Sequence, residues 1–187
     1  MTSTWTELLF YANVAAQGLL LVGAAWCIAF PARRIYPMDH KGAVFYVMWL
    51  IFYFAFLSNF ALVLLDWNSG PWTSTSRFFI GGPMALFGAA FVSWGIATLG
   101  SEKTSGLAVD DVLTTGGPYR YSRNPQYVGD MLLFAGVAVI ANSELVLVTH
   151  ALTSLVFLLA PLAEEPWLEA QFGKPYTAYR RDVPRFL

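Results

Sequence analysis

The feature that most limits the fold of this chain is a series of long apolar segments separated by short polar connections. One of them, AVFYVMWLIFYFAFLSNFALVLLD at residues 43–66, has Asp66 at its end as its only charged residue. A helix crosses the hydrocarbon core of a bilayer with about 20 predominantly apolar residues. Charged residues make up 12% of the chain, against about 25% in soluble domains. These observations indicate that the apolar segments lie in lipid.

Five such segments predict five transmembrane helices, at about residues 7–30, 43–66, 77–99, 125–141 and 143–163. The last two are separated only by a tight turn around Asn142, which predicts an antiparallel helical hairpin. The chain lacks the alternating strands and helices that a Rossmann domain requires. We therefore expect an all-α integral membrane protein with about five transmembrane helices and a cytoplasmic C-terminal cap, forming one domain over residues 1–187.

The basic residues predict how the protein is oriented in the membrane. Ten of the eleven Lys and Arg residues lie in the first connection, the third connection or the C-terminal tail, and Arg77 is the exception. Such an excess marks the cytoplasmic side. We expect a multi-pass protein of the cytoplasmic membrane, with its N-terminus outside and its tail in the cytoplasm. Because Arg33 and Arg34 follow the first apolar segment and no basic residue precedes it, this segment is expected to remain as an anchor.

Few residues offer metal or thiol chemistry. Cys27 is the only cysteine, which excludes a disulfide framework and a cysteine-rich metal site. His40 and His150 are far apart in sequence and lack the spacing of metal ligands, so structural roles are expected for both. Neither a metal nor a nucleic-acid partner is expected.

The polar chemistry is concentrated in GGPYRYSRNPQYVGD, residues 116–130. Asn124 is a favourable N-cap residue and Pro125 suits the first helical position, so a helix is predicted to begin at Pro125. A helix start presents unpaired N–H groups that favour anions. Arg120 and Arg123 precede this start, and Tyr127 lies within the first turn. The alternative interpretation is an ordinary capped helix whose arginines extend to the membrane surface.

A second cluster follows the fifth predicted span, in residues 161–187. Pro161 predicts a kink, after which Glu164 and Glu165 stand side by side at the membrane surface. The predicted hairpin brings this pair to the same end as the helix start at Pro125. A ligand with a carboxylate and a cationic centre, such as a zwitterionic amino-acid moiety, would satisfy both clusters. The alternative is that the two glutamates only cap a following helix.

Residues 100–187 resemble the isoprenylcysteine carboxyl methyltransferase family, which is related to the phospholipid methyltransferases. The resemblance rests on GGPYRYSRNPQY, the hydrophobic hairpin, the Glu164–Glu165 pair and EAQFGKPYTAYRRDVPRF. It implies S-adenosylmethionine as the methyl donor, with S-adenosylhomocysteine as its product. It implies donor contacts by Tyr119, Arg120, Asn124, Pro125, Gln126, Tyr127, Glu164, Glu165, Tyr176, Tyr179 and Arg180, and catalytic roles for Arg123, Tyr127 and Glu165.

The expected function is therefore an S-adenosylmethionine-dependent membrane methyltransferase whose active site faces the cytoplasm. Its acceptor would be a lipophilic molecule that enters from the surrounding membrane lipids, as in isoprenylcysteine carboxyl O-methylation. A phospholipid amine, a lipophilic thiol and an isoprenoid acid are further candidate acceptors. Two alternatives stay open at this point: an NADPH-dependent membrane reductase of the sterol or steroid type, and a non-catalytic membrane protein on the same scaffold.

Overall fold

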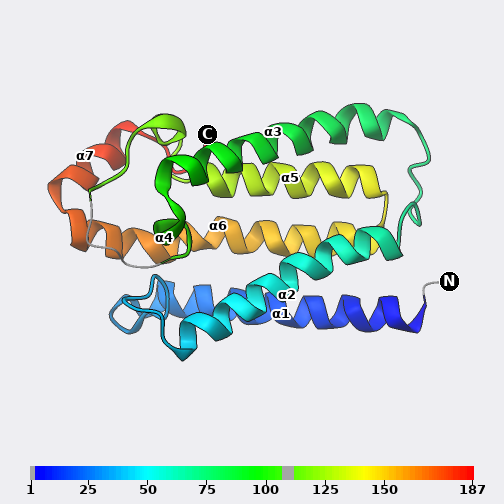
Figure 1. Ribbon diagram of the computed structural model, residues 1–187, viewed down its shortest axis with the longest axis horizontal. Helices are drawn as coiled ribbons and strands as arrows, with labels where there is room; N and C mark the ends of the chain where they lie inside the picture. Colours follow the sequence, from blue (N-terminus) through cyan, green and yellow to red (C-terminus); the bar gives the residue numbers. More distant parts are fainter. Residues whose placement is uncertain (1–2, 107–111) are drawn as a thin grey trace.

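The computed structural model describes residues 3–106 and 112–187, and the regular structure in these ranges is entirely helical (Figure 1). The long helices are α1 (Thr4–Ala29), α2 (Ala43–Leu65), α3 (Ser76–Leu99), α5 (Pro125–Ala141) and α6 (Glu144–Phe172). The short ones are η1 (Pro31–Arg33), α4 (Ser101–Thr104), η2 (Gly117–Arg120) and α7 (Lys174–Asp182). Four of the long helices are long and apolar enough to cross a membrane, and α5 is a shorter apolar helix of 17 residues. The predicted all-α membrane architecture is confirmed.

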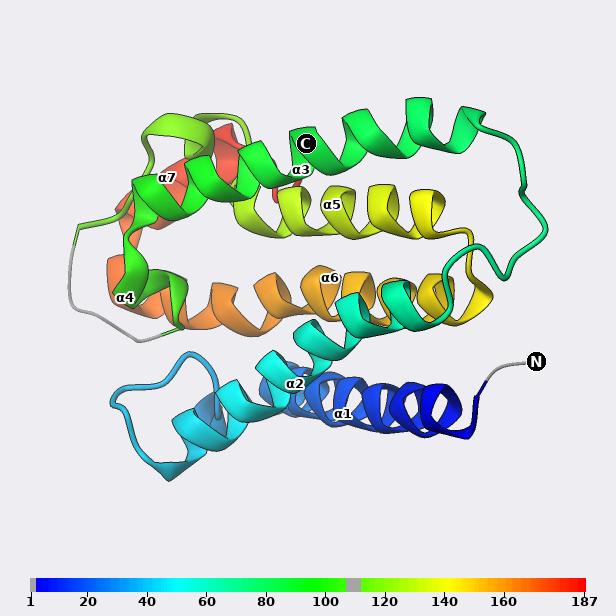
Figure 2. The ribbon, with the colours of Figure 1, turned by 45° about the vertical axis from the view of Figure 1, so that its right-hand side comes forward.

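The five long helices run up and down, so that their connections gather at two ends of the molecule (Figures 1 and 2). The connection between α1 and α2 lies at one end, together with α4, η2 and α7. The connection between α2 and α3 and the α5–α6 turn lie at the other end, with the N-terminus. The predicted hairpin of α5 and α6 is confirmed, and it places the starts of α5 and α7 at the same end.

Close packing of α3 against α5 depends on glycine. A Cβ atom added at Gly88 would lie 2.6 Å from the Gly129 carbonyl oxygen, and one added at Gly136 would lie 2.6 Å from the Gly81 carbonyl oxygen. Only glycine lets two helix backbones approach so closely, as is common in membrane proteins. This packing fixes α5, which carries the conspicuous polar motif at its N-terminal end.

A chain of buried polar side chains joins α1, α2 and α6. The Asn13 amide donates to Ser58 Oγ at 2.6 Å and to Asn59 Oδ1 at 3.1 Å. Asn59 donates to Thr153 Oγ1 at 2.8 Å, and Thr153 donates to Gln17 Oε1 at 2.9 Å. Hydrogen bonds of this kind hold transmembrane helices together, because the bilayer core offers no water as an alternative partner.

The last long helix extends beyond its predicted end. The fifth span was expected to finish near residue 163, but α6 continues through Pro161 and Pro166 to Phe172. A proline removes one backbone donor, and such a loss is tolerated in transmembrane helices where neighbouring groups compensate. Glu164 and Glu165 therefore lie inside a continuous helix, and the interpretation that they cap a new helix is wrong.

Candidate functional site

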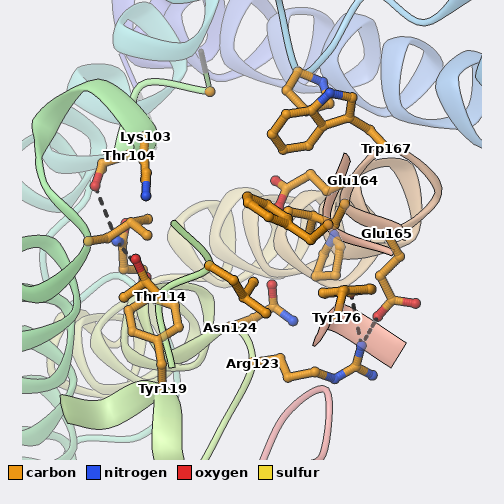
Figure 3. A pocket seen from close by; sticks show the side chains of 18 of the residues that line it. Lys103, Thr104, Thr114, Tyr119, Arg123, Asn124, Glu164, Glu165, Trp167 and Tyr176 are labelled. Atoms are coloured by element: carbon orange, nitrogen blue, oxygen red, sulfur yellow. Dashed lines mark hydrogen bonds and ion pairs between the residues drawn. The ribbon is translucent and has the colours of Figure 1, made fainter. Parts of the chain in front are cut away.

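A cavity of about 150 Å³ lies at the end of the molecule where α4, η2 and α7 gather. It is bounded by α5, α6 and α7 and by the connections that precede α2 and α5. Figure 3 shows Lys103, Thr104 and Thr114 on one side of this cavity, and Arg123, Glu165 and Tyr176 together on another. The predicted site residues that line it are Tyr119, Arg123, Asn124, Gln126, Tyr127, Glu164, Glu165, Tyr176 and Tyr179.

Three residues of the predicted set do not line the cavity. Pro125 is buried at the start of α5. Arg120 is exposed at the end of η2. Arg180 is exposed on α7 and pairs with Glu169 at 3.0 Å, away from the cavity lining. The structure thus separates these three side chains from the others.

The start of α5 lies where the sequence predicted it, but Asn124 has another role. The helix begins at Pro125, and Asn124 makes no side-chain capping hydrogen bond. Instead its amide group donates to the Arg185 carbonyl oxygen at 3.0 Å. The Arg123 backbone N–H donates to the Pro184 carbonyl oxygen at 2.9 Å. The residues that precede α5 therefore bind the segment that follows α7.

Glu165 is the centre of an ion-pair cluster. The Arg123 Nη1 atom lies 3.0 Å from Glu165 Oε1 and donates to the Tyr176 hydroxyl at 3.1 Å. Arg185 binds both oxygens of the same carboxylate. The hydrogen bonds to Glu165 raise the pKa of Arg185 above its ordinary value. The Arg123 Nε atom is buried and has no hydrogen-bond partner within the described residues.

Glu164 has a different environment from its neighbour. Tyr127 donates a short hydrogen bond to Glu164 Oε1, and the Phe157 ring stacks on the Tyr127 ring at a centroid distance of 5.5 Å. The Tyr36 hydroxyl lies 3.3 Å from the Tyr127 hydroxyl. Within the described ranges Glu164 pairs with no Lys or Arg side chain. Glu164 is thus bound by tyrosine and Glu165 by arginines, although the two residues are adjacent.

A second hydrogen-bonded group connects the elements on the far side of the cavity. Gln126 donates to the Tyr119 hydroxyl at 3.0 Å and to Thr104 Oγ1 at 3.2 Å. The Tyr179 hydroxyl donates to the Tyr119 carbonyl oxygen at 2.7 Å. Burial raises the pKa of both Tyr119 and Tyr179, so both phenols stay protonated at neutral pH. These contacts join α4, η2, α5 and α7 around one space.

Several lining residues were missed by the sequence analysis. Tyr36 and Pro37 come from the connection between α1 and α2, and Trp167 and Phe172 come from the extension of α6. One signal was available for Tyr36, because the basic residues of its connection already placed it at the same end as the motif. No comparable signal marked Trp167, since the fifth span was expected to end before it.

The fold and cavity define a multi-pass helical membrane protein with a polar site at one end. Comparison with known proteins gives the family: residues 76–175, just over half of the 187-residue chain, match the family model described as phospholipid methyltransferase. The chain belongs to this family.

One curated relative matches over a wider range. The chain is 29% identical over 138 residues to "Protein-S-isoprenylcysteine O-methyltransferase" of Dictyostelium discoideum. This alignment covers 71% of the chain and spans 58% of the length of that relative. No solved structure matches the chain. The resemblance found on the sequence motifs is thereby confirmed.

Proposed function

We propose that this protein transfers a methyl group from S-adenosylmethionine to a lipophilic acceptor, with the cavity as the donor site. One observation carries the proposal: Glu165 binds two arginines, while its neighbour Glu164 faces the cavity and has only tyrosine partners in the described part of the chain. A carboxylate in a low-dielectric site favours a positively charged ligand. The family match and the name of the relative support methyl transfer as the chemistry.

The residues around the cavity suit the chemical groups of S-adenosylmethionine. Glu164 would face its positive charge, and the Nε atom of Arg123, which has no partner in residues 3–106 and 112–187, would bind its carboxylate. Trp167, Tyr119 and Tyr179 supply aromatic surfaces for a nucleobase. When bound, the sulfonium donor supplies an activated methyl group, whose transfer leaves a neutral thioether. This set of residues fits the donor.

The protein's own part in such a reaction is positioning and exclusion of water. A methyl transfer from a sulfonium needs the nucleophile held in line with the methyl group, and close orientation of two reactants lowers the barrier. Tyr127 would fix Glu164 through their hydrogen bond, and Arg123 would hold the carboxylate of the donor beside it. We propose that the acceptor is a lipid-borne carboxylate, by analogy with the relative. Such an acceptor is already nucleophilic and needs no general base.

Admission of a complete donor requires some movement around the cavity. Sites for drug-sized ligands usually have volumes of about 300 Å³ or more, and this cavity has about 150 Å³. Phe172, Tyr176 and Tyr179 form the wall on the α7 side. We propose that α7 moves outward when the donor enters, and that this wall faces the cytoplasm. The cytoplasmic orientation of this wall is inferred from the excess of basic residues at the same end.

Binding and turnover test the proposal separately. Purified protein is titrated calorimetrically with S-adenosylmethionine, S-adenosylhomocysteine and NADPH, and we expect binding of the first two alone. It is then incubated with methyl-labelled donor and either a prenylated cysteine or a total lipid extract. Label recovered in an alkali-labile ester supports a carboxylate acceptor. Binding of NADPH without binding of S-adenosylhomocysteine would instead identify a reductase.

A further inference from the structure

The connection between α1 and α2 supplies a side of the cavity that lies outside the matched region. Tyr36 and Pro37 line the cavity, whereas the family match begins at residue 76. The Tyr36 ring packs closely on Gly106, where any added Cβ atom would overlap it. The Met38 backbone N–H also donates to the Gly106 carbonyl oxygen at 2.9 Å. Tyr36 is therefore held in place by the segment that follows α4.

The number of protons limits the hydrogen bonds that Tyr36 and Tyr127 can donate. A neutral phenol has one proton to donate and can accept through its oxygen. Tyr127 uses its proton in the bond to Glu164. The Tyr36 hydroxyl therefore keeps its own proton for Tyr127, 3.3 Å away, or for Glu164, with which it also forms a side-chain hydrogen bond. The three side chains form one hydrogen-bonded series, in which both phenols interact with Glu164.

Such a series makes each hydrogen bond depend on the one before it. A hydrogen bond accepted by a phenol oxygen polarises its O–H group and strengthens the bond that this group donates. Burial raises the pKa of Tyr36 far above its ordinary value, and the charge of Glu164 raises it further. Tyr36 therefore keeps its proton at neutral pH and stays a donor.

We propose that Tyr36 is a positioning residue of the methyl-transfer site, which fixes the Tyr127 phenol and the Glu164 carboxylate. The inference rests on the proposed function, because Glu164 is the group assigned to the positive charge of the donor. It gives the α1–α2 connection a role in the reaction, although Tyr36 precedes Tyr127 by 91 positions in the sequence.

A double-mutant cycle on donor affinity tests this role. Tyr36→Phe keeps the ring against Gly106 and removes only the hydroxyl, and Tyr127→Phe and the double variant complete the cycle. Affinity for S-adenosylhomocysteine is measured by calorimetry. We expect Tyr36→Phe to weaken binding roughly tenfold and to have a clearly smaller effect in the Tyr127→Phe background. Tyr121→Phe is the matched control, since this exposed phenol lies near the site without lining the cavity.

A second cycle measures the melting temperature of the same variants without any ligand. Residues in one hydrogen-bond series show non-additive effects, whereas independent residues add. If the wild type binds no donor, the proposed function fails, and the melting cycle still decides whether Tyr36 and Tyr127 act as one hydrogen-bonded series. Additive losses in melting temperature would overturn the inference. If the losses in melting temperature were non-additive but the losses of donor affinity were additive, Tyr36 would contribute only to packing. This result would overturn the inference as well.

Discussion

The Arg185 guanidinium binds both carboxylate oxygens of Glu165, with Nε–Oε1 and Nη2–Oε2 distances of 2.7 and 2.8 Å. Its backbone carbonyl oxygen accepts from the side chains of Ser122 and Asn124, at 3.2 and 3.0 Å. Arg185, which follows α7, is thus bound both to α6 and to the segment that precedes α5. These contacts hold α7, with Tyr176 and Tyr179, as a wall of the cavity.

Removal of the Arg185 side-chain contacts should loosen α7 without unfolding the protein. Arg185→Ala deletes a partly exposed ion pair, which contributes about 1 kcal/mol at most. We expect faster hydrogen exchange in residues 173–187 and unchanged exchange in α3 and α5. Arg181→Ala is the matched control, because Arg181 is exposed and its one ion pair among the described residues is with the neighbouring Asp182. Equal protection of the tail in both variants would show that Arg185 does not hold α7.

The two adjacent glutamates should respond differently to substitution by glutamine. Glu165→Gln leaves Arg123 almost buried without a carboxylate partner, since their side chains are only 12% and 9% exposed. Removing one partner of a buried pair costs about 3–5 kcal/mol, so the melting temperature should fall clearly.

Glu164→Gln should instead preserve stability and weaken the binding of S-adenosylhomocysteine. The glutamine carbonyl group can still accept from Tyr127, and the lost charge has no Lys or Arg partner in the described part of the chain. Calorimetric titration and thermal unfolding of both variants make the comparison. A stable Glu165→Gln protein beside an unstable Glu164→Gln protein would contradict this division of roles.

The sequence was sufficient for features that depend on local patterns. The apolar segments predicted the bounds of the long helices within a few residues, except for the end of α6 at Phe172, and the Asn124–Pro125 pair predicted the start of α5. The up-and-down order of the helices then predicted that this start would lie near the Glu164–Glu165 pair. Patterns of hydrophobicity and helix-start residues suffice here because the bilayer admits few alternatives to a helix.

The sequence could not show which of the neighbouring polar side chains face inward. On α7, Tyr176 and Tyr179 are three positions apart and both line the cavity. Arg180 follows Tyr179 by one position, about 100° further around the helix, and points into solvent. Tyr36 was missed for another reason. Its contact with Tyr127 is tertiary, and no local pattern marks it.

Asn124 offers a test that separates helix capping from attachment of the tail. Aspartate is as good an N-cap residue as asparagine, so a capping role predicts that Asn124→Asp is neutral. In the structure the amide group donates to the Arg185 carbonyl oxygen, and a carboxylate cannot donate this bond. We therefore expect Asn124→Asp to increase proteolytic cleavage after α7 and to lower the melting temperature. The corresponding change at a true side-chain cap, Ser3→Asp on α1, should be neutral because Ser3 accepts from the Thr6 backbone N–H.

The glycine contact between α3 and α5 should be the most sensitive packing feature of the chain, and Gly88→Ala tests it. The added methyl group would lie 2.6 Å from the Gly129 carbonyl oxygen, which belongs to a helix backbone and cannot turn away. The helices must separate, and overpacking of this kind costs about 1–3 kcal/mol. Because α5 begins with the cavity residues, donor affinity should fall together with the melting temperature. Gly82→Ala is the matched control on the same helix: apart from its own helix turn, no atom of the described residues lies within 4 Å of its added Cβ, and alanine is favoured over glycine in a helix by about 1 kcal/mol. Stability of the Gly82 variant should be equal to or above that of the wild type. A Gly88→Ala protein as stable as the Gly82→Ala protein would mean that α3 and α5 are not packed as closely as described.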